Sequence, residues 1–366
     1  MWSCRYTQFA RRVCTSGGAA VCLGLALLGG CGQPRESALP ALAARLDQTS
    51  VSGLSSGAYM AGQFELAHAS IIVGAGIIAG GPYGCAESFY ADAMPGPGTA
   101  FLNLSKAING CMLDALRSFG IPDAKQLAAR AAQLADKGRI DPLAATRRHR
   151  VYLFSGQQDR TVVPAIVAAA RDLYLAIGVA DSNVKFVQDL PAGHAFVTQD
   201  RGASCERTDP PYIVDCDYDQ AGDLLRQIYG DLSPKAADPA GQLLYFDQRE
   251  FVQGLTNHSM SDVGAAYIPS TCQKSSDCRV HVAFHGCAQN RATVGDAFIK
   301  DTGYLQWAET NRLVVLFPQA ERTTANPQGC WDWWGYTGPD FLTKDGPQIV
   351  AVRRMLERLA GPRSLI

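Results

Sequence analysis

The 366-residue chain has no excess of charge of either sign. Its 33 lysines and arginines are matched by 34 aspartates and glutamates, which gives a formal net charge of −1 at pH 7. Proteins that bind nucleic acid or another acidic polymer usually carry a strong basic excess. The composition therefore argues against a nucleic-acid partner and fits an uncharged substrate.

The sequence also lacks an early apolar run long enough to span a bilayer comfortably. The run from Ala19 to Leu28 follows three arginines and has the length of the apolar region of a signal peptide. It ends in Leu-Gly-Gly-Cys at 28–31, which resembles the lipobox of bacterial lipoproteins. We expect residues 1–31 to be an export signal and a lipidated Cys31 to tether the protein to the cell envelope, in the periplasm or at the cell surface. Ordinary signal cleavage near the same place, which would release a secreted protein, is the alternative.

The sequence offers little for a metal ion. No C-x-x-C pair or histidine-rich spacing accompanies the cysteines, and such spacings are typical of zinc sites. Five aspartates crowd the stretch 209–223, but they miss the glycine-anchored spacing of an EF-hand loop. Cys205 and Cys216 flank much of that stretch. We therefore expect a disulfide-pinned, solvated loop there, and no metal in the protein.

Cysteine usage agrees with export. Four of the twelve cysteines lie within residues 1–31, so an even number of eight remains, which indicates disulfides in an oxidising compartment. The sequence does not determine their pairing, although two pairs are close enough in sequence to bridge local loops. These are Cys205 with Cys216 and Cys272 with Cys278, which would leave Cys85 with Cys111 and Cys287 with Cys330.

No internal repeat or low-complexity linker divides the chain after the export signal, so we expect one domain over residues 32–366. Apolar runs of strand length lie at 71–79, 151–154, 184–187, 243–246, 281–284 and 313–317. Helical patterns lie between and after them, at 58–69, 124–136, 164–176, 220–229, 302–310 and 347–359. Alternating strands and helices predict an α/β protein with a mostly parallel sheet covered on both faces.

The first chemical motif follows a short strand-like segment, Leu46 to Val51. The residues Gly-Leu-Ser-Ser-Gly at 53–57 stand directly before a helix, which is the strand–turn–helix context of the G-x-S-x-G nucleophile elbow. Such a turn projects Ser55 from the sheet edge, and the N–H of Ser56 then points at a developing oxyanion. A glycine-serine turn without function is the alternative.

A nucleophilic serine needs a base, and the base needs an orienting carboxylate. Asp159 follows the strand 151–154, and His194 follows the strand 184–187, in the chain order Ser, acid, His of α/β-hydrolases. Both would leave the carboxyl ends of consecutive strands, the edge from which Ser55 must also emerge. His258 is the main rival base, but it follows no clear parallel strand. We therefore predict a triad of Ser55, Asp159 and His194.

One departure from the usual α/β-hydrolase order is informative. Only 24 positions separate Cys31 from Ser55, which leaves room for a single strand where several normally precede the nucleophile. The missing strand and its oxyanion loop fit the segment 281–284 and the turn His-Gly-Cys at 285–287. A circular permutation explains this order, since domain termini often lie close together. We expect the N–H groups of Ser56 and Cys287 to form the oxyanion hole; the alternative is that the turn has no catalytic part.

Four segments together resemble the single-domain, circularly permuted poly(3-hydroxybutyrate) depolymerases. They are Gly-Leu-Ser-Ser-Gly-Ala-Tyr-Met at 53–60, Ala-Gly-Gly-Pro-Tyr-Gly-Cys at 79–85, His-Gly-Cys at 285–287 and Gly-Cys-Trp-Asp-Trp-Trp at 329–334. The resemblance spans nearly all of the chain after the export signal. It implies an α/β-hydrolase fold and a serine esterase that hydrolyses a polyester of 3-hydroxybutyrate or its oligomers.

The resemblance also carries site residues onto this chain. It assigns the triad to Ser55, Asp159 and His194, and it implies that Asn326 and Trp331 line the cleft that grips the polymer. The clustered tryptophans of 331–334 fit an apolar platform, although we expect at least one of them to be structural. No cofactor or obligate protein partner is implied. Alternatives are an esterase for feruloyl or acetyl groups on polysaccharide and a non-catalytic surface lipoprotein with the same fold.

Overall fold

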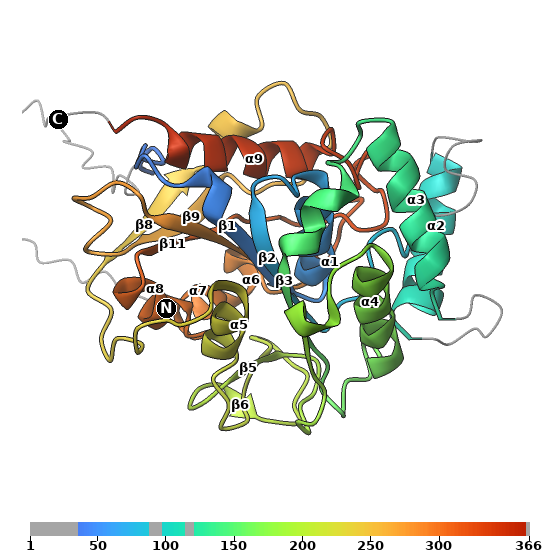
Figure 1. Cartoon of the computed structure of the whole chain (residues 1–366), viewed down its shortest axis with the longest axis horizontal. Coiled ribbons are helices and arrows are strands. Elements are labelled where there is room, and N and C mark those ends of the chain that lie inside the picture. Colours follow the sequence, from blue (N-terminus) through green and yellow to red (C-terminus); the bar gives the residue numbers. More distant parts are fainter. Residues whose placement is uncertain (1–35, 88–96, 114–120, 364–366) are drawn as a thin grey trace, which may run out of the picture. The chain divides into compact units, whose positions relative to one another are not determined.

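The computed structural model describes residues 36–87, 97–113 and 121–363, so the predicted export signal and Cys31 lie outside the described residues. An eight-stranded sheet crosses the unit that begins at Glu36, in the order β4-β3-β2-β1-β10-β11-β9-β8 (Figure 1). Its strands are β1 (Thr49–Leu54), β2 (Ile72–Ile78), β3 (Arg150–Phe154), β4 (Val184–Val187), β8 (Gln242–Asp247), β9 (Val263–Ile268), β10 (Arg279–Phe284) and β11 (Leu313–Phe317).

The predicted mostly parallel sheet is confirmed. The strands from β4 through β1 to β11 pair in parallel, and only β9 and β8 pair antiparallel at one edge. β1 therefore lies in the interior of the sheet, with β2 on one side and β10 on the other. We did not predict β9, whose Val-Gly-Ala-Ala start has few large apolar residues. A Cβ on Gly264 would lie 2.6 Å from the ring of Phe246, so this small residue is required by close packing.

Helices cover both faces of the sheet. The long helices are α1 (Ser56–Ala67), α2 (Pro97–Cys111), α3 (Ala124–Asp136), α4 (Pro164–Ala176), α5 (Gln220–Tyr229), α8 (Tyr304–Thr310) and α9 (Pro347–Ala360), and the one-turn helices are α6 (Arg291–Val294) and α7 (Ala297–Lys300). Short 3-10 helices are η1 (Leu46–Gln48), η2 (Leu143–Arg148), η3 (Asp181–Asn183) and η4 (Arg249–Phe251). None of the helices in the described part of the chain has the length and apolar character to cross a membrane.

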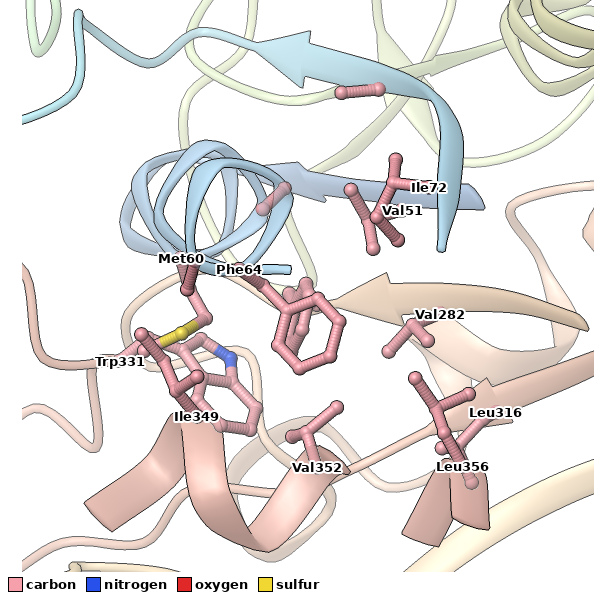
Figure 2. Packing of buried hydrophobic residues seen from close by; sticks show 14 of the residues in the cluster. Val51, Met60, Phe64, Ile72, Val282, Leu316, Trp331, Ile349, Val352 and Leu356 are labelled. Carbon is pink, nitrogen blue, oxygen red and sulfur yellow. The ribbon is translucent and has the colours of Figure 1, made fainter. Parts of the chain in front are cut away.

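Two apolar clusters bury the two faces. Strand residues alternate between them: Leu316 of β11 belongs to the cluster that includes residues of α1, α3, α4 and α9, whereas Phe317 belongs to the cluster that includes residues of α5, α7 and α8. Because both faces of the sheet are covered, the sequence of β11 is an unbroken run of apolar residues and does not alternate between apolar and polar residues. Figure 2 shows the first cluster, in which Phe64 of α1, Val282 of β10 and Val352 of α9 converge.

The chain ends of this unit lie side by side, as a circular permutation requires. The N–H groups of Leu42 and Ala44 donate to the carbonyl of Leu359 at the end of α9, at 3.0 and 3.1 Å, and Ala43 N–H donates to Gly361. The segment that leads into β1 is thus attached by backbone hydrogen bonds to the C-terminal helix. Joining those two ends would place β10 and β11 before β1, which is the usual order of the fold.

The structure settles the pairing of the cysteines that the sequence left open. The disulfides are Cys205–Cys216 and Cys272–Cys278, which bridge local loops, and Cys85–Cys111 and Cys287–Cys330. The Cys205–Cys216 bridge pins a three-stranded sheet that we did not predict, in the order β5-β7-β6. Its strands are β5 (Phe196–Thr198), β6 (Ala203–Ser204) and β7 (Ile213–Asp215). Among the described residues, no cluster of histidine, cysteine, aspartate or glutamate could hold a metal ion.

A polar network interrupts the apolar interior beneath β1. The ring nitrogens of His281, Nδ1 and Nε2, lie 2.6 and 2.8 Å from the hydroxyls of Ser50 and Ser52. Those hydroxyls in turn bond to Tyr229 and Tyr304, at 2.7 and 2.6 Å. The ring is fully buried, and burial lowers the pKa of His281 to about 3. The imidazole is therefore neutral and joins the two strands β1 and β10 as a hydrogen-bonding group.

This network predicts a loss of stability in mild acid. Between the ordinary histidine pKa of about 6.5 and a folded-state pKa of about 3, the unfolded chain binds a proton at His281 that the folded chain does not. The unfolding free energy therefore falls with decreasing pH by up to about 1.4 kcal/mol per unit from this residue. We expect His281→Gln to remove that contribution, so denaturant unfolding of the variant between pH 7 and 4.5 loses stability less steeply.

The control for this measurement is His258→Gln, because the ring of His258 is only partly buried. The pH slope of that variant should stay close to the slope of the unaltered protein. Identical pH slopes for His281→Gln and the unaltered protein would show that the buried ring does not govern acid sensitivity.

Candidate active site

Ser55 stands at the turn between β1 and α1 with an unusual backbone. Its φ is +57° and its ψ is −121°, a region that residues other than glycine rarely occupy. The turn is fixed by hydrogen bonds: Ser55 N–H donates to Ile78 O at 2.9 Å, and its carbonyl accepts from Ala58 and Tyr59 at the start of α1. This is the strand–turn–helix geometry that the G-x-S-x-G pattern predicts. Ser55 is 8% exposed.

The two glycines of the elbow are required by close backbone approach. A Cβ on Gly53 would lie 2.2 Å from the carbonyl carbon and oxygen of Gly57. A Cβ on Gly57 would lie 2.3 and 2.5 Å from the carbonyl oxygens of Phe284 and His285. These are backbone atoms that cannot rotate away. The first turn of α1 is therefore in direct contact with the end of β10 and the loop that follows it.

Asp159 and His194 form a buried pair. Asp159 Oδ2 lies 2.8 Å from His194 Nδ1, and Asp159 Oδ1 accepts hydrogen bonds from the N–H groups of Thr161 and Val162 at 2.8 and 2.9 Å. The two residues are 2% and 5% exposed. Since both carboxylate oxygens accept hydrogen bonds, His194 Nδ1 is the donor of the pair. Its Nε2 is thereby left as the nitrogen that can accept a proton.

Backbone hydrogen bonds join the loops that carry this pair. Ser155, Gln157 and Gln158 N–H donate to the carbonyls of Val187, Leu190 and Ala192, at 2.9–3.0 Å. The loop after β3 therefore runs alongside the loop after β4. His194 is also supported from the other side, because its N–H donates to Thr208 Oγ1 at 2.8 Å. Thr208 lies in the segment that the Cys205–Cys216 disulfide closes.

All three predicted triad residues leave the sheet at the same edge. β1, β2, β3 and β4 are consecutive parallel neighbours, and Ser55, Asp159 and His194 each follow the carboxyl end of a strand in this set. Ligands of open α/β sheets bind at that edge. The arrangement can therefore support nucleophilic acyl transfer: a strained serine, a histidine of defined tautomer and a carboxylate that holds it.

The two predicted oxyanion donors lie on segments that touch. Ser56 is the first residue of α1, and Cys287 follows β10, whose end contacts Gly57. Within the part of the chain that the structure describes, neither the N–H of Ser56 nor that of Cys287 has a protein acceptor. Helix N-termini leave such donors unpaired, and they attract negative charge. The Cys287–Cys330 disulfide holds the second donor loop.

The structure places Trp331 and Asn326 in the interior of the protein. Both side chains are fully buried. Trp331 packs edge-on against Phe284, with ring centroids 5.0 Å apart. Asn326 binds both the N–H and the carbonyl of Cys330, at 2.8 and 2.7 Å. They pack beneath the glycine-rich aromatic loop of residues 329–338, and their role in substrate binding stays a prediction.

The remaining aromatic residues of this loop form a small cluster beside the elbow. The ring of Trp333 stacks on Tyr59 of α1, with centroids 4.1 Å apart, and the side chain of Tyr59 donates to the carbonyl of Cys111 at the end of α2. Cys85, Cys111, Cys330 and Trp334 complete the cluster. The Cys85–Cys111 bridge joins α2 to the loop after β2, and the Cys287–Cys330 bridge joins the aromatic loop to the loop after β10. Tyr59 connects both to α1.

Asp332 organises the same loop, and our reading of the sequence missed it. Its Oδ1 accepts from the N–H groups of Trp334, Gly335 and Tyr336, and its Oδ2 accepts from Thr337. Burial raises the pKa of Asp332, and these donors oppose the rise. An aspartate followed by glycine and threonine is typical of a side chain that caps its own turn, which is the signal available in the sequence.

Curated proteins similar to this chain are polyester-degrading enzymes. A poly(3-hydroxybutyrate) depolymerase of Delftia acidovorans is 39% identical over 328 residues, which are 88% of this chain and 62% of that protein. A polyhydroxybutyrate depolymerase of Talaromyces funiculosus is 33% identical over 351 residues, which are 91% of this chain and 95% of that protein. The chain thus spans about three fifths of the Delftia protein and nearly all of the fungal one. No protein-family model matches the chain.

Solved structures similar to this one belong to the same class of enzyme as the curated proteins. A PHB depolymerase from Penicillium funiculosum has a TM-score of 0.77 to this structure at 31% identity, covering 88% of this chain and 99% of that one. A serine-to-alanine variant of a PHB depolymerase, complexed with an R3HB trimer, has a TM-score of 0.78 at the same identity and coverage. At this identity and coverage the likeness shows the same fold over most of the chain.

The contact at Gly57 predicts that the elbow tolerates no side chain there. In Gly57→Ala the new methyl group would meet two backbone carbonyls at 2.3 and 2.5 Å, so α1 and the loop after β10 must move apart. We expect a loss of about 3 kcal/mol in unfolding free energy, the upper range for an overpacked site, measured by denaturant unfolding. Gly62→Ala on the same helix is the control, because its methyl group would make only ordinary contacts at 3.8 and 3.9 Å. Equal stability of the two variants would contradict the close approach.

Proposed function

Because the chain belongs to the poly(3-hydroxybutyrate) depolymerase family, we propose that it is a serine esterase that hydrolyses the ester bonds of poly(3-hydroxybutyrate) or of its oligomers. The observation that carries the proposal is the buried Asp159–His194 pair at the sheet edge from which the strained Ser55 emerges. Burying an ionisable pair of this kind costs free energy, so packing alone does not explain it. It is the arrangement that activates a serine hydroxyl.

The proposed reaction has two half-reactions. The Ser55 hydroxyl attacks the ester carbonyl while His194 Nε2 takes its proton, and Asp159 stabilises the imidazolium through Nδ1. The N–H groups of Ser56 and Cys287 stabilise the oxyanion. The alcohol end of the chain leaves with the proton from His194, and an acyl-enzyme remains on Ser55. A water molecule, deprotonated by His194, then releases the acyl half as a carboxylic acid and restores the serine.

The four disulfides indicate an exported protein, since such bonds persist in oxidising compartments. We propose in addition that residues 1–31 form the export signal and that lipidation of Cys31 tethers the catalytic domain of residues 32–366 to the cell envelope. The support is the Leu-Gly-Gly-Cys sequence at 28–31 after an apolar run. Labelling with a radioactive fatty acid in the producing cell, lost in Cys31→Ala, would test the tether.

An apolar surface beside the elbow favours a solid polyester over small soluble esters. The large exposed apolar residues of the described chain gather on α2 and the segments next to it: Phe101, Leu102, Leu104, Ile108, Leu113 and Ile121. Phe101, Leu104 and Ile108 share one face of the helix, and Phe101 is 70% exposed. The opposite face, with Ala107 and Cys111, is buried in the aromatic cluster that contains Tyr59. We propose that this α2 face adsorbs to the polymer surface.

Removing apolar area from the α2 face should weaken adsorption without affecting the chemistry. For Phe101→Ser combined with Ile108→Ser we expect binding to a poly(3-hydroxybutyrate) film to fall at least about tenfold, because each side chain contributes roughly 1.5–3 kcal/mol when fully buried. Hydrolysis of a soluble short-chain ester should stay within about twofold. Lys125→Ser on α3, which is exposed and polar, is the control. Unchanged film binding, or loss of binding to lipid vesicles only, would contradict polymer adsorption.

The function itself is tested with a suspension of poly(3-hydroxybutyrate). We expect the protein to clear it and release 3-hydroxybutyrate or its oligomers, Ser55→Ala to be inactive, and Asp159→Asn to lose about 10⁴-fold in kcat because the histidine tautomer is wrong. Asp209→Asn is the control, since Asp209 is an exposed partner of Arg207 in a neighbouring loop. Clearing by Ser55→Ala would refute the nucleophile.

Two other outcomes would replace the proposal. Ser55-dependent hydrolysis of feruloyl or acetyl esters of polysaccharide, without polyester cleavage, would identify a carbohydrate esterase. No hydrolysis of any ester, and no labelling of Ser55 by a serine-reactive phosphonate, would identify a non-catalytic surface protein.

A further inference from the structure

The loop that carries Cys287 contains a buried histidine outside the triad. His285 follows β10 and is fully buried. Its Nδ1 lies 2.7 Å from the carbonyl oxygen of Gly286, and its Nε2 lies 3.1 Å from the N–H of Ala320. An N–H group can only donate, so Nε2 accepts and Nδ1 carries the hydrogen. The two partners therefore define a single tautomer of a neutral ring.

The electrostatic surroundings agree with this assignment. Burial lowers the pKa of His285 to about 4, against a smaller opposing effect of its hydrogen bond to Gly286. A neutral ring is also the only form that lets Nε2 accept from Ala320. His285 is thus unsuited to exchange protons with a substrate near neutral pH, and its ring serves as a fixed donor.

The carbonyl that His285 holds belongs to the peptide unit of the oxyanion donor. The C=O of Gly286 and the N–H of Cys287 are parts of one planar peptide group. In a trans peptide these two bonds point in opposite directions, so a hydrogen bond that fixes the carbonyl also fixes the direction of the N–H. The orientation of the Cys287 donor therefore depends on the atom that binds the Gly286 oxygen.

Besides His285, only one longer hydrogen bond from the described residues reaches this carbonyl, and the other contacts hold the residues on either side of the peptide. Gly286 N–H donates to Gln289 Oε1 at 2.8 Å, and Gln289 N–H donates to Gly286 O at a longer 3.3 Å. The disulfide to Cys330 restrains the side chain of Cys287. Gly286 itself has no side chain to oppose rotation of the peptide. A rotated peptide would turn the carbonyl oxygen toward the developing negative charge in place of the N–H.

We propose that His285 is a positioning residue for the oxyanion hole: its Nδ1–H holds the Gly286 carbonyl so that the N–H of Cys287 faces the oxyanion formed on the substrate. The inference rests on the proposed function, because it assumes that Cys287 N–H is an oxyanion donor. His285 makes no contact with substrate in this role. It acts through the peptide bond, and Ala320 selects its tautomer.

Two substitutions separate the two ring nitrogens. In His285→Asn the side-chain amide can place an N–H near the position of Nδ1, so the bond to Gly286 O is retained and the bond to Ala320 is lost. In His285→Gln the amide oxygen reaches the position of Nε2 and can accept from Ala320, while no donor remains at the position of Nδ1. Each variant loses one buried hydrogen bond, so the two should lose similar stability.

Their kinetics should differ. Loss of one oxyanion donor costs about 10²–10³ in kcat, and a donor that is present but misdirected should cost less. On a soluble short-chain ester we expect His285→Gln to lose about 10–100-fold in kcat with KM changed by less than about twofold. We expect His285→Asn to stay within about threefold of the unaltered enzyme. The rate at which a phosphonate ester labels Ser55 should follow kcat, because labelling also forms an oxyanion at that site.

Thermal unfolding of both variants completes the test. Equal losses of kcat in the two variants, in proportion to their loss of Tm, would show a merely structural role and overturn the proposal, as would full activity of His285→Gln. Failure of the proposed function gives a different pattern. In that case the unaltered protein hydrolyses no ester and its Ser55 does not react with the phosphonate, which removes the basis of this inference too.

Discussion

The close approach between the start of α1 and the end of β10 determines how the parts of this site lie relative to one another. Gly57 lies against the carbonyl oxygens of Phe284 and His285 with no room for a Cβ. This contact brings together the two segments on which we predict the oxyanion donors, although Ser56 and Cys287 are more than 200 positions apart in sequence. The parallel pairing of β1 with β10 extends along the strands up to that point. The sheet register therefore sets the distance between the turn at Ser55 and the loop that carries Cys287.

His194 and Asp159, the proposed base and its carboxylate, are positioned by a different means, namely hydrogen bonds between loops. The backbone after β3 forms hydrogen bonds with the backbone after β4. Asp159 accepts hydrogen bonds from two backbone N–H groups through one carboxylate oxygen and contacts His194 through the other. Because these bonds are buried, breaking one leaves an unsatisfied donor or acceptor that costs about 1–3 kcal/mol. The imidazole therefore keeps its tautomer and orientation without any bound ligand, which is the preorganisation that a catalytic base requires.

The sequence was sufficient for those features that depend on local pattern. The elbow at 53–57, the order of Ser55, Asp159 and His194, and most helix boundaries follow from motifs and periodicity. Features set by tertiary packing were missed. The full burial of Trp331 and Asn326 could not be foreseen, because a glycine-rich loop gives no periodicity that separates its inner from its outer side chains. The antiparallel strand β9 and the small sheet within 196–215 were missed for a similar reason, because neither shows the alternation of apolar and polar residues that predicts a strand. Close packing of small residues stabilises β9, and a disulfide stabilises the small sheet.

The aromatic cluster beside the elbow connects the export of the protein to the organisation of its site. Tyr59 of α1 stacks on Trp333, and the bridges at Cys111 and Cys330 attach α2 and the aromatic loop to the same cluster. A bridge that closes a loop of 26 residues contributes about 3–4 kcal/mol in the chain-entropy model. This bridge adds to the burial of Ala107 and Cys111 and to the hydrogen bond from Tyr59 that hold α2 in place. Oxidation of the cysteines thus strengthens the attachment of a helix whose outer face is apolar, beside the turn that carries Ser55.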